Sequence, residues 1–153
     1  MTERMELPLT PIDFLLRART LFPDREGVIQ HADGHRALVY TYAQMAERSA
    51  RLAQMLQNDF GVEPGDRVAW LCGNRHELLE AYYGVLLAGA VLMPLNIRLS
   101  APELRAQLDD SRAAVLVRDP TLTDVAHPVR EVPLGEEYEA RLAAQAHAWV
   151  EPP

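Results

Sequence analysis

Short apolar runs alternate with longer helical patterns through the middle of the chain, and this alternation limits the possible folds more than any other feature. Residues 67–72, 91–95 and 113–118 are short, mostly apolar runs typical of buried parallel strands. Residues 75–90 and 101–110, which lie between them, carry apolar side chains at helical spacing. Parallel strands are joined by crossovers that are usually helices. The pattern therefore predicts strand–helix–strand units, with helices on both faces of a mixed or parallel sheet.

Two more helices and a hairpin are expected earlier in the chain. Apolar residues at steps of three and four predict helices over residues 11–22 and 42–60. Residues 28–31 and 37–40 favour β-strands, and Asp33-Gly34 between them supplies the positive φ of a tight turn. These two runs predict a β-hairpin.

Two pairs of residues mark helix starts. Thr41 with Gln44, and Ser100 with Glu103, have the spacing of a capping box, in which each side chain bonds the other residue's backbone N–H. The first pair places a helix start directly after the hairpin.

The end of the sequence adds a short strand over residues 129–132 and a helix over residues 136–149. A chain of 153 residues is long enough for one domain, which would bury about 68–70% of its unfolded surface. We therefore expect residues 1–153 to form one α/β domain. Its sheet is expected to be mixed and mainly parallel, with helices on both faces and an N-terminal β-hairpin.

Charge and residue usage exclude several classes of function. The formal net charge is −7, so the chain lacks the basic surface that holds nucleic acid. All 15 basic residues are arginines, which excludes a Schiff-base lysine and a phosphate-loop lysine. Cys72 is the only cysteine, so a disulfide framework is excluded and a cytoplasmic location is expected. No apolar stretch reaches the ~20 residues of a membrane span.

The turn after the first parallel strand is the natural place for a ligand, because such sheets bind ligands at the carboxyl ends of their strands. Backbone N–H groups at Gly73-Asn74, assisted by Arg75, could hold an anion. The alternative is that Gly73 and Asn74 only turn the chain and cap the following helix. Base rates favour the cap. Gly84 and Gly89 have phosphate-loop spacing, but no Lys-Ser/Thr pair follows them, so this match fails.

Two histidines and an aspartate at the hairpin turn are candidate metal ligands. His31, Asp33 and His35 are too few for a metal site with enforced geometry, and a solvated turn is the favoured interpretation.

Cys72 is interpreted as a small core residue rather than a nucleophile at a helix start. Asp109-Asp110 is interpreted as an acidic helix end, because adjacent helical side chains point about 100° apart.

Several motifs in order carry a resemblance to a known family. They are LVYTYAQM (38–45), GVEPGDRVA (61–69) and LAGAVLMPLN (87–96), followed by RLSAPEL (98–104) and LDDS (108–111). This order resembles the N-terminal region of the AMP-forming acyl- and aryl-CoA synthetases, in the superfamily that also holds firefly luciferase and peptide-synthetase adenylation domains. LFPDR (21–25) and PLNIRL (94–99) are more similar to synthetases for fatty or related carboxylic acids. Cys72 departs from the proline that relatives commonly carry before the asparagine.

The resemblance implies a reaction in which a carboxylic acid and ATP give an acyl-adenylate, from which CoA displaces AMP. ATP, Mg²⁺ and CoA are then the cofactors and substrates of the full-length family, and none is expected to bind this chain alone. The family's phosphate loop and its mobile C-terminal domain lie later in the chain. We therefore expect residues 1–153 to be an incomplete N-terminal subdomain, with no catalytic, cofactor-binding or metal residue and no activity in isolation.

Three interpretations of the chain's role remain. The first is the N-terminal part of a ligase or one half of a split ligase, whose partner is the remainder of the enzyme. The second is a non-catalytic assembly module, whose exposed apolar surface binds another protein or a second copy of the chain. The third, a stand-alone nucleotide-binding domain, lacks support because no glycine-rich phosphate site occurs.

Overall fold

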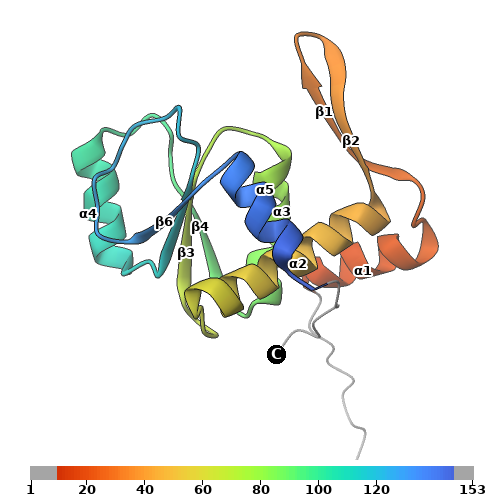
Figure 1. The fold of residues 1–153 in the computed structure, drawn as a ribbon, viewed down its shortest axis with the longest axis horizontal. Helices are drawn as coiled ribbons and strands as arrows, with labels where there is room; N and C mark the ends of the chain where they lie inside the picture. The colour runs from red at the N-terminus through yellow and green to blue at the C-terminus, as the bar shows by residue number, and fades with distance from the viewer. Residues whose placement is uncertain (1–9, 147–153) are drawn as a thin grey trace, which may run out of the picture.

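A computed structural model describes residues 10–146 as an α/β structure (Figure 1). In chain order the elements are α1 (Pro11–Leu21), β1 (Glu26–Ala32), β2 (His35–Thr41), α2 (Tyr42–Phe60), β3 (Arg67–Leu71), α3 (His76–Leu87), β4 (Val91–Pro94), α4 (Ala101–Ser111), β5 (Val115–Arg118), β6 (Arg130–Pro133) and α5 (Glu136–Ala144). Among the described residues, no helix is both long enough and apolar enough to cross a membrane.

Four strands form one parallel sheet in the order β4-β3-β5-β6. The β1-β2 hairpin is a separate antiparallel sheet that rises away from the helices (Figure 1). The predicted α/β class, the parallel strands and the hairpin are confirmed. Of the two sheet types left open by the sequence, the described strands form the parallel one, because β1 and β2 pair only with each other.

Each face of the parallel sheet packs against helices. Side chains of Val68, Trp70 and Val117 join the larger core under α2, α3 and α5. Their neighbours Ala69 and Leu116 point to the other face, where they join the smaller core under α4. Because successive strand residues point to opposite faces and both faces are covered, these strands appear in the sequence as continuous apolar runs.

Helix ends follow local sequence signals. The backbone N–H of Thr41 donates to Gln44 Oε1 at 2.9 Å, and that of Ser100 donates to a Glu103 oxygen at 2.8 Å. Both predicted capping boxes are therefore confirmed. Gly61 ends α2 at φ 65°, a left-handed conformation that glycine adopts at little cost.

Two predicted helices are shorter in the structure. The helix expected over residues 75–90 ends at Leu87, because Gly89 takes φ 76° and turns the chain into β4. The helix expected over residues 136–149 ends at Ala144, since Gln145 is already extended at φ −78° and ψ 147°. Residues 147–149 of that prediction lie outside the described residues.

Gly84 has a packing role within α3. A Cβ atom at this position would lie 2.7 Å from Leu52 Cδ2 and 2.8 Å from Leu52 Cβ on α2. The missing side chain is what allows α2 and α3 to approach closely. Gly84 and Gly89 thus serve a helix contact and a turn, in agreement with the failed phosphate-loop match.

Gly84→Ala is expected to destabilise the fold. Alanine favours a helix interior over glycine by about 1 kcal/mol, but overpacking against Leu52 costs about 1–3 kcal/mol. We expect a net loss of about 1 kcal/mol in urea unfolding. Gly73→Ala is the matched control, because a Cβ there meets no atom within 4 Å. If Gly84→Ala leaves the stability unchanged or raises it, the side chain of Leu52 can move aside at little energetic cost.

Candidate functional site

The chain order of the parallel strands reverses between β3 and β5, and the crevice at their carboxyl ends is the expected ligand position. In this structure the crevice holds the chain's own Arg75. Its Nε donates to Glu77 Oε2 at 2.7 Å, and its Nη1 donates to Asp119 Oδ2 at 3.1 Å, beyond the end of β5. Anion binding at Gly73-Asn74 would need Arg75 as the cation. Arg75 is already paired with two carboxylates, which argues against an anion site there.

Three adjoining hollows open around Asn74 at the same edge. The hairpin hollow, of about 270 Å³, lies between the hairpin and the start of α3. The strand-end hollow, of about 360 Å³, lies beyond β3 and β4. The helix hollow, of about 180 Å³, shares Asn74, Leu78 and Tyr82 with the strand-end hollow and Asn74, Arg75 and Leu79 with the hairpin hollow.

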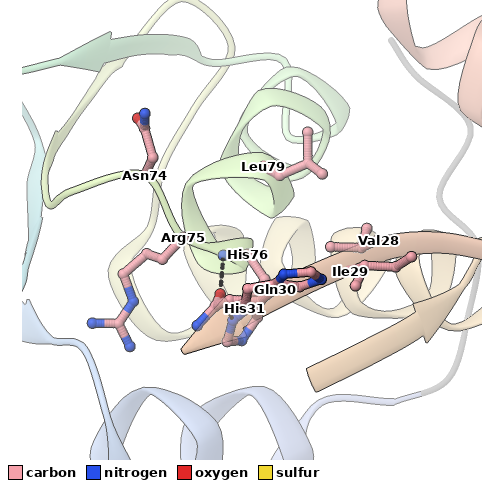
Figure 2. A pocket seen from close by; sticks show the side chains of 8 residues that line it. All are labelled: Val28, Ile29, Gln30, His31, Asn74, Arg75, His76 and Leu79. Carbon is pink, nitrogen blue, oxygen red and sulfur yellow. Dashed lines mark hydrogen bonds between the residues drawn. The ribbon is translucent and has the colours of Figure 1, made fainter. Parts of the chain in front are cut away.

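The lining of each hollow mixes apolar side chains with a few polar groups. The hairpin hollow is lined by Val28, Ile29, Gln30, His31, Asn74, Arg75, His76 and Leu79 (Figure 2). The strand-end hollow is lined by Trp70, Cys72, Gly73, Asn74, Leu78, Tyr82, Pro94, Leu95, Asn96 and Ile97. In Figure 2 the Asn74 carboxamide points away from the hairpin side chains. Arg75 is the only arginine in either lining.

The start of α3 is capped from the hairpin. The backbone N–H of His76 donates to Gln30 Oε1 at 2.9 Å, and His76 Nδ1 lies 3.0 Å from the same oxygen (Figure 2). Arg75 stands at the N-cap and makes no side-chain capping bond. The prediction that Gly73-Asn74 caps this helix is therefore wrong, because Arg75 is the N-cap residue and the side chain of Gln30 accepts the first helical N–H.

A charge network around the buried Glu80 joins three helices. Arg48 on α2 donates to Glu80 on α3 through Nη2 at 3.2 Å and to Glu139 on α5 through Nη1 at 2.9 Å. The Tyr138 hydroxyl donates to Glu80 Oε2 at 2.8 Å. The guanidinium of Arg48 also lies 4.9 Å from the centre of the Tyr40 ring. No sequence pattern indicated this network, because its hydrogen-bonded partners are 32 to 91 residues apart.

Burial dominates the electrostatics of this network. Glu80 is fully buried, and loss of hydration raises the pKa of its carboxyl, while the Arg48 guanidinium opposes that rise. The two carboxylates raise the pKa of Arg48, which therefore stays charged. Burial also raises the pKa of Tyr138, so its hydroxyl remains a donor to Glu80.

One group of side chains has the spacing of a metal site within residues 10–146. Ligand atoms of His76, Glu77 and Glu139 lie within 4.8 Å of one another. Glu77 is paired with Arg75 and Glu139 with Arg48, so a cation would have to displace two guanidinium groups. The arrangement suits internal ion pairing. His31, Asp33 and His35 form no such group among the described residues.

The structure agrees with the interpretations given above to Cys72, to Asp109-Asp110 and to the hairpin turn. Cys72 is buried, and burial raises the pKa of its thiol to about 11, the opposite of what a nucleophile requires. Asp109 and Asp110 are exposed on the last turn of α4, and Asp109 Oδ1 lies 3.0 Å from His127 Nε2. Asp33 and Gly34 form the hairpin turn with positive φ, as predicted.

Comparison with known proteins gives a continuous match. Residues 17–149 match the family described as AMP-binding enzyme. The chain is 43% identical over 107 residues to a feruloyl-CoA synthase of Amycolatopsis sp, covering 67% of this chain and 22% of that one. It is 40% identical over 128 residues to a long-chain-fatty-acid–CoA ligase of Thermus thermophilus, covering 82% and 23%. The chain thus spans about a fifth of the length of these relatives.

The structural comparison agrees. The chain superposes on the N-terminal domain of FACL13 from Mycobacterium tuberculosis with a TM-score of 0.77 and 28% identity. This match covers 92% of the present chain and 38% of that one. More than half of that solved chain therefore lies outside the match.

Arg48→Met is expected to destabilise the fold by about 3–5 kcal/mol, because it leaves the buried Glu80 carboxylate without its counter-charge. Denaturant unfolding measures the loss. Arg36→Met, which breaks an exposed pair with Glu26, is the control and should cost at most about 1 kcal/mol. Adding Glu80→Gln to Arg48→Met should restore part of the stability. Equal losses in the two single variants would contradict the role given to the network.

The stability of the fold is expected to fall as pH drops below about 6.5, partly through His76. Burial lowers the pKa of His76 in the folded state, although the nearby Glu77 opposes this. The unfolded chain therefore takes up the proton first, and folding loses at most about 1.4 kcal/mol per pH unit below 6.5. Glu80, with a raised pKa, acts in the opposite direction.

A variant at His76 measures the contribution of this histidine to the pH dependence of stability. His76→Gln should flatten the pH dependence of the unfolding free energy between pH 7.5 and 5. An identical slope in the His76 variant and the parent protein would refute this assignment.

Proposed function

Because the chain belongs to the AMP-binding enzyme family, we propose that it forms the scaffold portion of an AMP-forming acyl-CoA synthetase. The reaction is carboxylic acid plus ATP plus CoA to acyl-CoA, AMP and pyrophosphate. The continuous match of residues 17–149, joined to 40% identity with a CoA ligase over 128 residues, is the observation that carries this proposal.

The acyl substrate belongs to the class of fatty or related carboxylic acids. One relative is named for feruloyl-CoA and another for long-chain fatty acids, although both share about 40% of their matched residues with this chain. The same scaffold is therefore compatible with quite different acids. We infer that residues outside this chain select among them.

ATP, Mg²⁺ and CoA are proposed as ligands of the assembled enzyme and not of this chain alone. The hollows around Asn74 do not suit a triphosphate, because their single arginine is paired with Glu77 and Asp119 and the chain has no lysine. We assign no catalytic, cofactor-binding or metal residue to it. The part played by its own residues is to hold the parallel sheet and its helices in place.

The proposed partner is the remainder of a ligase, on the same chain or a separate one. The net charge of −7 argues against a nucleic-acid partner, and the single cysteine suits the cytoplasm. A non-catalytic assembly module, including a homodimer, is the second candidate. It is supported by exposed apolar side chains such as Phe14, Tyr82 and Val91.

The proposal predicts that activity appears only in a completed enzyme. The 153-residue chain with ATP, Mg²⁺ and a fatty acid should release no pyrophosphate above background. A fused protein, in which this chain replaces the matching 128-residue region of the Thermus ligase, should form acyl-CoA. The unmodified Thermus ligase is the positive control. Pyrophosphate release by the chain alone would contradict the first expectation, and a folded but inactive fused protein would contradict the second.

A further inference from the structure

Four of the large apolar side chains that remain exposed gather on one surface. Ile29, Leu79, Tyr82 and Ile97 are 36–48% exposed, and all four line the adjoining hollows around Asn74. They come from the hairpin, from α3 and from the loop after β4. We call this surface the carboxyl-edge face. The exposed apolar residues Phe14 and Leu21 lie outside it, on α1.

Few charged side chains line the carboxyl-edge face. Its arginine, Arg75, is paired with Glu77 and Asp119. Charged residues make up 24% of the chain, so an apolar face whose only arginine is internally paired contrasts with the general surface. Depletion of charge around exposed aromatic and aliphatic side chains is typical of the centre of a protein interface, because an unpaired charge would lose hydration there.

The face also offers shape and hydrogen-bonding groups. Its hollows of about 270 and 360 Å³ are open, so side chains of a partner can enter them. Asn74 lines all three hollows, and its carboxamide points away from the hairpin group (Figure 2). A partner that covers this face would bury Tyr82 and Ile97 and could bond the Asn74 amide. Such an arrangement has an apolar centre and a small number of polar contacts.

We infer that the carboxyl-edge face is the docking surface for the rest of an AMP-binding enzyme domain. This inference rests on the proposed function. The chain matches 38% of the solved N-terminal domain of FACL13, at a TM-score of 0.77. The same scaffold therefore exists there beside a larger body of polypeptide, which must cover part of its surface. The occupant has an apolar contact surface that fills the hollows along α3.

Hydroxyl-radical footprinting tests the inference at the level of side chains. The oxidation rates of Leu79, Tyr82 and Ile97 are compared between the full 153-residue chain and the fused protein built on the Thermus ligase. All three should be oxidised readily in the free chain and several-fold more slowly in the fused protein. Phe14 and Leu21, which are 63% and 54% exposed, are matched controls and should react equally in both.

Several outcomes would overturn the inference. Unchanged oxidation of Tyr82 and Ile97 in a folded fused protein means that the rest of the domain docks elsewhere. Protection in the free chain that grows with protein concentration means that the occupant is a second copy of this chain. A fused protein that fails to fold also counts against the inference, because the face then does not match the body of the ligase.

A substitution separates docking from folding. Tyr82→Asp should leave the Tm of the free chain nearly unchanged, because the side chain is 47% exposed there, and should lower the Tm of the fused protein by several degrees. Phe14→Asp is the control and should affect both proteins equally. Equal effects of Tyr82→Asp on the two proteins refute the docking role.

Activity distinguishes this inference from the proposed function. An active fused protein with unprotected Tyr82 refutes the docking surface alone. An inactive fused protein with protected Tyr82 refutes the proposed function alone.

Discussion

The helices on one face of the sheet depend on the pairing of Arg48 with Glu80. A carboxylate with no exposure to water is tolerated only when a counter-charge and hydrogen bonds replace its hydration, and Arg48 and the Tyr138 hydroxyl supply them. Since Arg48 lies on α2, Glu80 on α3 and Tyr138 on α5, meeting this requirement fixes the three helices relative to one another. Apolar packing alone would allow small shifts, whereas a buried ion pair does not.

The same principle governs the carboxyl edge of the sheet. Arg75 pairs with Glu77 and with Asp119, which follows β5, so an internal ion pair lies at the position where parallel sheets often bind a ligand. The neighbouring hollows are open, and they are lined by Leu79, Tyr82 and other largely uncharged side chains. The arginine at this edge is thus held in internal ion pairs, and most of the side chains around it in the hollows are uncharged. This division agrees with a scaffold that is completed by further polypeptide.

The apolar cores and the charged network of this chain are joined through Tyr138. A chain that spans about a fifth of its relatives carries two apolar cores, one on each face of its parallel sheet. Tyr138, which donates to Glu80 and meets Trp70 edge to face at 6.1 Å, couples the charged network to the apolar core. The residues of this chain therefore tie the charged network and the sheet core into one packed unit.

The sequence by itself determined the local elements. Apolar runs predicted the parallel strands, the Thr41 and Ser100 boxes fixed two helix starts, and Asp33-Gly34 fixed the hairpin turn, because each signal acts over only a few residues. The family was also readable from ordered motifs. Only the tertiary structure decided that the hairpin is a separate sheet, that Gln30 caps α3 and that Arg48 joins three helices. These contacts join residues far apart in the chain, and no local propensity or periodicity records which distant side chains will meet.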